Sequence, residues 1–380
     1  MYQSKSHRPT WAEINIDAIR SNLKLIMSKC SPEIQIVGVV KADAYGHGAI
    51  IIAQELTRLG VQYLGVATLD EGIELRTNGI TIPIILFGPV EVQEFSKLME
   101  FNIYPTIVNL SYAKDLAEAY RYRGIFPKVH IEIDTGMGRL GIPYERALLE
   151  IEQISSIPGM IIDGIFTHFP AADTDIEFSK EQLEKFKNLI SEVKRLDIKI
   201  KHFHIANSAA IFSLEESTKT PFTMIRPGLA IYGYSSTPIP SLRNSMTLKT
   251  KVISIREMKK GESVSYLRTY RIKNEREFIA VLPVGYADGI PTLYSNRGYV
   301  VIKNKKFPVV GRVCMDYTMV SLGENSSNIE IGDEVIIFGN GGISVEEFGK
   351  ICSLIPYEVT CGVSKRVPRT YIRQEDRVDF

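Results

Sequence analysis

The sequence predicts an α/β protein in which an N-terminal (β/α)8 barrel of the TIM type is followed by a mainly β C-terminal domain. The 380 residues are too many for one small core. Short apolar runs alternate with helical patterns from residue 34 to about residue 234, and the runs that follow Pro238-Ile239-Pro240 are β-rich. We therefore assign residues 12–240 to the barrel and residues 241–380, together with residues 1–11, to the β domain.

The first elements are a short strand and a helix. Residues 11–16 alternate between apolar and polar side chains, and Asp17 can cap a helix whose apolar face includes Ile19, Leu23 and Ile26. Eight apolar runs of strand length follow, with helical stretches between them, as in a (β/α)8 barrel. A doubly wound open sheet would give a similar pattern, so that alternative stays open here. The strand candidates are residues 34–40, 63–67, 83–87, 103–106, 129–133, 164–167, 202–205 and 223–226.

The helices between these strands are predicted from their apolar periodicity. The clearest one begins near Ser179, because Ser179 and Gln182 have the spacing of a capping box. The other helical stretches are residues 49–59, 69–76, 92–99, 111–120 and 144–154.

The β domain is predicted from apolar runs separated by turn signals such as Lys260-Gly261 and Gly332-Asp333. One short helix should begin at Ser344, where Glu347 completes a capping box. The expected strands are residues 248–256, 278–282, 299–302, 307–313, 318–322 and 334–338.

Composition narrows the functional class. A net charge of +1 without a basic run gives no support for a nucleic-acid partner, and no apolar stretch is long enough to span a membrane. The four cysteines show no CxxC spacing, which favours free thiols in a reducing compartment, and we expect no metal site. The segment Met1 to Pro9 lacks an apolar signal core. We therefore expect a cytoplasmic protein.

The most informative single residue is Lys41. It follows the apolar run 34–40 and precedes a loop that contains Gly46 and Gly48. In a (β/α)8 barrel this is the rim where catalytic groups gather. A lysine that is desolvated there can form a Schiff base with a carbonyl cofactor. The alternative for this residue alone is a surface lysine after a strand.

The surrounding motif extends this interpretation. V-V-K-A-D-A-Y-G-H-G, residues 39–48, resembles the pyridoxal-phosphate lysine segment of bacterial alanine racemases. D-T-G-M-G-R-L-G (134–141), H-I-A-N-S-A-A (204–210) and I-R-P-G (225–228) also match that family in order. The resemblance covers essentially the whole chain. It implies a homodimeric, pyridoxal 5′-phosphate-dependent isomerase that interconverts L-alanine and D-alanine and supplies D-alanine for peptidoglycan.

The resemblance also implies roles for individual residues. Lys41 would carry the cofactor, Arg139 would contact its phenolic oxygen and the substrate carboxylate, and His168 would lie beside its ring. The phosphate would be bound by Ser208 and by the backbone N–H groups of Gly228 and Leu229. From the residues themselves, Asn207 and Ser208 also form a plausible helix N-cap. The full set of expected cofactor-binding residues is Lys41, Tyr45, Arg139, His168, Asn207, Ser208, Arg226, Gly228, Leu229 and Tyr357.

Arg226 has a specific chemical consequence. In the family this arginine faces the pyridine nitrogen of the cofactor. A guanidinium does not give up its proton, so the nitrogen stays largely unprotonated and the cofactor is a weaker electron sink. That disfavours transamination. A carboxylate at this position would have the reverse effect, and it is what a decarboxylase on the same two-domain fold would need.

The β domain is expected to supply the second base. S-Y-L-R-T-Y (265–270) resembles the segment that bears this base, Tyr266, although the family usually has glycine where this chain has Leu267. G-R-V-C-M-D (311–316) matches the segment in which the backbone N–H of Met315 holds the substrate carboxylate. By resemblance, Lys41 and Tyr266 serve opposite faces of the substrate. Tyr266 and Met315 would reach the cofactor of the other subunit in a head-to-tail dimer, and Tyr286 would line the entrance.

Two alternatives to the main interpretation concern function. A non-catalytic pyridoxal-phosphate-binding protein is usually a lone barrel, and the β domain with Tyr266 argues against it. Serine or another small amino acid could replace alanine as the substrate, although the bulk of Tyr357 favours alanine.

One residue departs from the family pattern. Many members have a lysine, modified to a carbamate, where this chain has Glu132. Glu132 lies between two isoleucines of a predicted strand, and a buried carboxylate without a partner would be costly. We expect Glu132 to make a bidentate contact with Arg139 and so to orient it.

Overall fold

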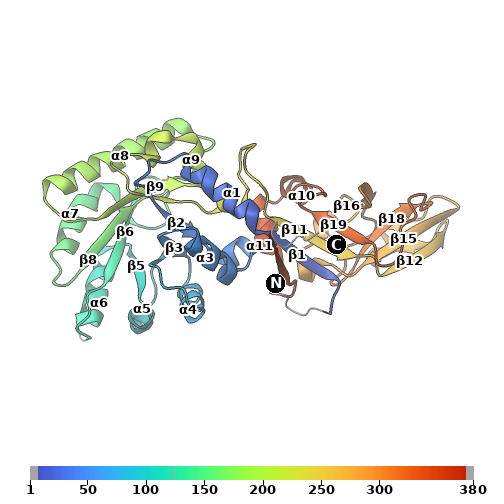
Figure 1. Ribbon diagram of the computed structural model, residues 1–380, viewed down its shortest axis with the longest axis horizontal. Helices are drawn as coiled ribbons and strands as arrows, with labels where there is room; N and C mark the ends of the chain where they lie inside the picture. Colours follow the sequence, from blue (N-terminus) through green and yellow to red (C-terminus); the bar gives the residue numbers. More distant parts are fainter. Residues whose placement is uncertain (1–6, 122, 374–380) are drawn as a thin grey trace.

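The computed structural model describes residues 7–121 and 123–373, so residues 1–6 and 374–380 of the assigned β domain lie outside the described part. The molecule is elongated, with the barrel in one half and the β-rich domain in the other (Figure 1). Helices α1 (Ile16–Met27) and α11 (Pro356–Gly362) lie between the two halves.

The N-terminal half is a closed barrel of eight parallel strands. Its strands pair in the order β5-β4-β3-β2-β10-β9-β8-β6, and β5 pairs with β6 to close the ring. The predicted barrel is confirmed, and the open doubly wound sheet is excluded by this closing pair. Their bounds are β2 (Gln35–Val39), β3 (Tyr63–Val66), β4 (Ile84–Leu86), β5 (Ile103–Ile107), β6 (Lys128–Asp134), β8 (Ile161–Phe166), β9 (His202–Asn207) and β10 (Met224–Arg226), with β7 (Ile142–Pro143) appended to β6.

Helices surround the barrel because each carries one apolar stripe. In α8 (Ile176–Arg195), for example, Leu183, Phe186, Ile190 and Val193 recur at helical spacing and are buried. The remaining helices are α2 (Lys41–Gly46), α3 (Ala49–Arg58), α4 (Leu69–Thr77), α5 (Phe95–Glu100), α6 (Leu110–Arg121), α7 (Tyr144–Ser155), α9 (Ser208–Ser213) and, in the β domain, α10 (Val345–Cys352).

Two predicted helix starts were wrong. Helix α1 is capped by Asn15, whose side chain accepts from the Ala18 amide, and Asp17 lies in its first turn. Helix α8 is capped by Asp175 and begins before the predicted cap at Ser179. Gln182 is instead buried and donates to the Thr135 hydroxyl and the His168 carbonyl.

The β domain is built on a six-stranded sheet in the order β17-β16-β19-β11-β1-β20. Its strands are β1 (Thr10–Asn15), β11 (Met246–Lys251), β16 (Tyr299–Ile302), β17 (Lys305–Pro308), β19 (Glu334–Phe338) and β20 (Arg369–Ile372). Strand β1 lies between β11 and β20. Residues 12–15, which we assigned to the barrel, therefore lie in this sheet.

A smaller sheet carries the outer end of the β domain. It consists of β12 (Ser254–Lys259), β15 (Arg276–Leu282) and β18 (Thr318–Gly323), beside the hairpin β13 (Ser263–Val264) and β14 (Tyr270–Arg271). The predicted strand 248–256 is thus two strands, because the chain leaves the large sheet after β11 and joins the small one as β12. The predicted helix after Ser344 is confirmed, and the Ser344 hydroxyl accepts from the Glu347 amide.

Six short 3-10 helices complete the described elements: η1 (Val92–Glu94), η2 (Glu215–Thr218), η3 (Leu229–Tyr232), η4 (Tyr266–Arg268), η5 (Tyr286–Asp288) and η6 (Thr292–Tyr294). Within residues 7–121 and 123–373, no helix is both long and apolar enough to cross a membrane.

Candidate active site

A cavity of about 480 Å³ lies at the C-terminal ends of the barrel strands, where TIM-type barrels place their sites. All ten residues that the sequence predicts to bind a cofactor line it, although they come from distant parts of the chain. These are Lys41, Tyr45, Arg139, His168, Asn207, Ser208, Arg226, Gly228, Leu229 and Tyr357.

The backbone that carries Lys41 is an unusual left-handed turn. Residues Ala42 to Tyr45 all have φ between 51 and 54°, although none of them is glycine. Each such residue costs about 1–2 kcal/mol relative to a right-handed conformation, so the turn persists only because its surroundings hold it. The sequence predicted only a glycine-containing loop here.

Polar contacts to neighbouring elements hold this turn. The carboxylate of Glu71, in α4, accepts from the amides of Ala42, Ala67 and Thr68. Asp43 accepts from the Ala49 amide. Glu71 was not among the predicted site residues, although Thr68 and Glu71 form a capping box that their three-residue spacing could have revealed.

Helix α11 packs directly against the same turn. A Cβ atom at Gly46 would lie 2.1 Å from the carbonyl oxygen of Thr360, so only glycine allows this approach. The approach brings Tyr357, on α11, to the cavity, where its ring lies 6.2 Å from the Tyr45 ring.

The environment of Lys41 favours its neutral amine. Burial, with the positive charge of Arg139 second, lowers the pKa of Lys41 below its usual value, although Glu71 acts in the opposite direction. A lysine with a lowered pKa is a better nucleophile and a better proton acceptor near neutral pH.

Arg226 is buried at the floor of the cavity, and both of its Nη atoms donate to named partners. Nη1 donates to Nδ1 and the carbonyl oxygen of His204, at 2.8 and 3.0 Å. Nη2 donates to the Thr167 carbonyl at 2.7 Å and contacts His168 Nδ1 at 3.3 Å. The guanidinium also lies 5.0 Å from the centre of the Phe166 ring. Its orientation is therefore fixed before any ligand binds.

His168 is held neutral. Burial, followed by the charges of Arg226 and Arg139, lowers the pKa of His168 to about 3. At neutral pH its ring therefore offers one donor and one acceptor and carries no charge.

Asn207, Ser208 and Gly228 form one rim of the cavity. Asn207 caps α9, as predicted, by accepting from the Ala210 amide. The Ser208 hydroxyl accepts from the amides of Gly228 and Ala230, at 2.8 and 3.2 Å. A Cβ at Gly228 would lie 2.5 Å from the Tyr45 hydroxyl, so glycine leaves room for the tyrosine here.

The expected bidentate contact between Glu132 and Arg139 is wrong for this structure. Both residues line the cavity and lie in the described part of the chain, but no hydrogen bond or ion pair joins them. Burial raises the pKa of Glu132, while the charges of Arg139 and Arg226 oppose that rise. Glu132 is buried, whereas Arg139 lies on an exposed loop, so the two interact only through space.

Two other predicted site residues do not line this cavity. Tyr266 and Met315 lie on the β domain with 67% and 52% of their surface exposed. The turn of Tyr266 has positive φ at Ser265, Leu267 and Arg268, so Leu267 adopts the conformation that glycine would take without strain. The Ser265 hydroxyl ties this turn to the carbonyl of Arg312, close to Met315 in the chain.

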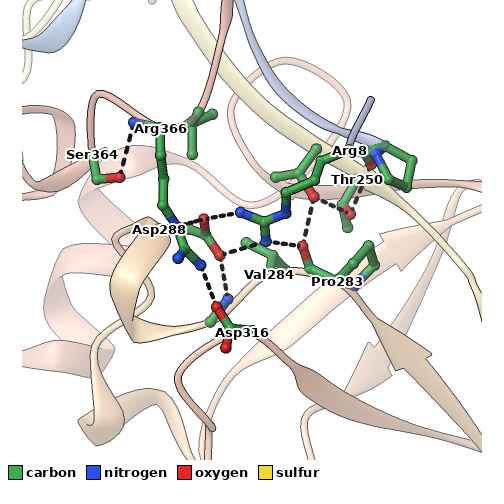
Figure 2. Close-up of polar contacts among 12 residues, drawn as sticks. Arg8, Thr250, Pro283, Val284, Asp288, Asp316, Ser364 and Arg366 are labelled. Carbon is green, nitrogen blue, oxygen red and sulfur yellow. Dashed lines mark hydrogen bonds and ion pairs between the residues drawn. The ribbon is translucent and has the colours of Figure 1, made fainter. Parts of the chain in front are cut away.

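Figure 2 shows the cluster that supports the Met315 loop. At its centre is the Asp288 carboxylate, whose side chain has no exposed surface. It accepts from Arg8 at 2.7 and 3.1 Å, from Arg366 at 2.7 Å and from the Gly285 amide at 2.9 Å. Arg366 also pairs with Asp316 at 2.6 Å.

This cluster fixes two exposed residues relative to each other. The amide of Tyr286 donates to the Cys314 carbonyl, and the amide of Ala287 donates to the Met315 carbonyl. Tyr286 is 45% exposed. Tyr286 and Met315 therefore form one ordered, outward-facing surface of the β domain.

Both halves of the chain match known protein families. The family model described as "Alanine racemase, N-terminal domain" matches residues 14–236, and that of the C-terminal domain matches residues 245–371. Alanine racemase 1 of Clostridium acetobutylicum is 42% identical over 98% of this chain and 97% of its own length.

Solved structures of alanine racemases superpose on nearly the whole chain. The alanine racemase of Clostridium difficile 630 superposes with a TM-score of 0.92 at 37% identity, covering 97% of both chains. The alanine racemase of Bacillus anthracis with bound L-Ala-P superposes with a TM-score of 0.89 at 32% identity, over 98% of this chain and 97% of that one. The chain therefore belongs to the alanine racemase family of amino-acid isomerases.

Proposed function

We propose that the chain binds pyridoxal 5′-phosphate through Lys41 and interconverts L-alanine and D-alanine. The observation that carries this proposal is the arrangement of one cavity. A lysine with a lowered pKa, a buried arginine with directed donors and a neutral histidine line the same space.

The residues present fit this cofactor. Lys41 offers an amine for a Schiff base, and Tyr45, Ser208 and Tyr357 offer hydroxyl groups for a phosphate. Gly228 keeps the backbone open beside Tyr45. Arg226 lines the same cavity. Its guanidinium can only donate hydrogen bonds, so it can face a ring nitrogen without protonating it.

When bound, pyridoxal phosphate withdraws electrons from the α-carbon of the amino acid and so acidifies its α-proton. Lys41, once its amine is free, takes or returns this proton on one face of the substrate. Tyr266 of a second copy does so on the other face. Arg139, on the exposed loop after β6, binds the substrate carboxylate. Arg226 disfavours protonation of the ring nitrogen, which favours return of the proton to the α-carbon.

The proposal includes a homodimer. Tyr266 and Met315 are absent from the cavity wall of their own chain and lie on exposed loops of the β domain, which the Ser265 hydroxyl joins through Arg312 and Cys314. A head-to-tail dimer would bring this surface to the cavity of the other subunit. The backbone N–H of Met315 would then bind the substrate carboxylate, and Tyr286 would lie at the entrance.

The proposed role of the protein, which would act in the cytoplasm, is to supply D-alanine for peptidoglycan. Tyr357 narrows the cavity and favours alanine over larger amino acids, and we propose no metal requirement.

The experiment that tests this function uses the purified protein with added pyridoxal phosphate. Borohydride reduction and peptide mapping should find the label on Lys41, and a label on another lysine would reject that assignment. Chiral analysis of the products from L-alanine, L-serine and L-lysine should show rapid racemisation of alanine. Release of carbon dioxide would indicate a decarboxylase, and cofactor binding without turnover would indicate a binding protein. Lys41→Ala is the control that should lose both label and activity.

A further inference from the structure

A column of buried polar side chains runs through the barrel beneath the cavity. It begins at Arg226, at the C-terminal end of β10, and continues through His204 and His130 to Asp163, near the start of β8. All four residues are buried. Of these, only Arg226 lines the cavity, so the other three are not accounted for by ligand binding.

The directions of the two hydrogen bonds in this column follow from Arg226, and the charge of Asp163 at the other end favours the same arrangement. A guanidinium can only donate, so Nδ1 of His204, 2.8 Å from Arg226 Nη1, must accept. A neutral imidazole with an accepting Nδ1 carries its proton on Nε2. His204 Nε2 lies 2.9 Å from His130 Nδ1, which must therefore accept as well. The proton of His130 is then on Nε2. This atom makes no hydrogen bond to a described residue, but it lies 3.4 Å from the Asp163 carboxylate, whose negative charge favours a proton on that nitrogen.

The surroundings keep both imidazoles neutral and the carboxylate charged. Burial lowers the pKa of His130 and of His204 below the usual histidine value. Burial raises the pKa of Asp163, but the interaction with His130 outweighs this and lowers the pKa overall. The Tyr63 hydroxyl also donates to the Asp163 carboxylate at 3.2 Å.

The planes of the groups are fixed by packing. The ring of His204 stacks on Phe166 with 5.0 Å between centroids and 17° between planes. Arg226 lies over the same Phe166 ring. A rotation or a tautomer change of His204 would therefore turn a donor toward the donor of Arg226.

We propose that His130 and Asp163 are positioning residues, which fix His204 in the tautomer whose Nδ1 accepts from Arg226 and so hold the guanidinium in place. They act through Arg226 and touch neither substrate nor cofactor. The kinetic consequence rests on the proposed function, whereas the tautomer assignment does not.

The first test is ¹⁵N NMR of histidine-labelled protein, with and without pyridoxal phosphate. The chain has six histidines, so single substitutions can assign the spectrum. The parent should show His204 as a single Nε2–H tautomer. His130→Asn places an accepting oxygen where the accepting Nδ1 of His130 lies, and this variant should preserve the tautomer of His204. His130→Leu has nearly the same shape without the oxygen, and His204 should then populate both tautomers.

The second test is kinetic, with alanine as substrate. His130→Leu should lower kcat about tenfold with less than a twofold change in KM, and His130→Asn should recover to within threefold of the parent. His202→Leu is the matched control, because His202 is a buried barrel histidine that bonds to Tyr63 and Thr223 and reaches Asp163 only indirectly, through the Tyr63 hydroxyl. It should stay within threefold of the parent. In a His204→Leu background, His130→Leu should have little further effect, because both act through one contact.

Several results would overturn the inference. One is a single Nε2–H tautomer of His204 in His130→Leu together with parental kcat, which would mean that Arg226 alone sets the tautomer. Another is an equal loss in His202→Leu, which would mean a general packing effect. If His130→Leu does not fold, the same two measurements can be made on Asp163→Leu and Asp163→Asn, because Asp163 is the next residue of the column after His130. Failure of alanine turnover in the parent would instead refute the proposed function and leave the NMR result standing.

Discussion

Replacing Asp288 by asparagine should loosen the surface that carries Tyr286 and Met315. The Asp288 carboxylate is inaccessible to solvent and binds two arginines and one backbone amide. Asparagine keeps the shape and one accepting oxygen but removes the charge. Arg8 and Arg366 then lose the Asp288 carboxylate, although Arg8 keeps the Pro283 carbonyl and Arg366 keeps Asp316.

The size of this effect can be worked from the contacts. Hydrogen bonds to a charged group contribute about 1.5–3 kcal/mol each. The side chains of Arg8 and Arg366 are 35% and 39% exposed, so water replaces part of what they lose. We therefore expect a local loss of about 2 kcal/mol, which corresponds to roughly thirtyfold faster hydrogen exchange in the loops that the cluster joins.

The assay is hydrogen exchange measured by mass spectrometry on peptides that cover residues 283–290 and 312–317. The amides of Tyr286 and Ala287 bond across these two loops and should report the change. Asp316→Asn is the matched control, since it removes one pair whose side chains are 39% and 46% exposed and should change exchange little. If Asp288→Asn accelerates exchange no more than Asp316→Asn does, the carboxylate does not hold the surface.

The same cluster predicts an acid response. Burial alone would raise the pKa of Asp288, but its bonds to Arg8, Arg366 and the Gly285 amide lower it overall. A carboxyl whose folded-state pKa lies below the unfolded value of about 3.9 contributes stability above that value. Protection of the two loops should therefore be constant from neutral pH to about pH 5 and be lost as pH falls below 4. Asp288→Asn should remove this acid-dependent step.

Three further outcomes are expected. Tyr266→Phe should reduce deuterium exchange at the α-carbon of L-alanine more than that of D-alanine, and equal small losses would remove Tyr266 from the two-base scheme. Mixing inactive Lys41→Ala and Tyr266→Ala chains should restore part of the activity through hybrid dimers, and no recovery after proven subunit exchange would mean that one chain builds each site. Because no bond joins Glu132 to Arg139, Glu132→Gln should lower kcat/KM by less than threefold, without dependence on dissolved carbon dioxide. A tenfold loss would show that the contact forms when substrate binds.

The sequence predicted best what depends on strand ends. Lys41, His168, Asn207 and Arg226 each follow or end an apolar run, and parallel strands bring such positions to one rim. The cavity accordingly contains all four. A local signal, the capping-box spacing of Ser344 and Glu347, located the start of α10.

The features that the sequence did not predict depend on distant contacts or on competing local signals. The left-handed turn after Lys41 is held by Glu71 and by the approach of α11, neither of which periodicity can foresee. The start of α8 was misplaced because Asp175 and Ser179 both offer cap spacing, and the fold selects the earlier one. The Glu132 contact was inferred from the family pattern and from the cost of a buried, unpaired carboxylate, without the position of the loop that carries Arg139.

The placement of β1 has a consequence for synthesis of the chain. The first described strand lies between β11 and β20, which are encoded more than 230 and 350 residues later. All eight barrel strands are synthesised before either neighbour of β1, so β1 stays unpaired while most of the barrel emerges. The two halves are consequently not separable by one cut at the linker, because the sheet of the second half needs the beginning of the first.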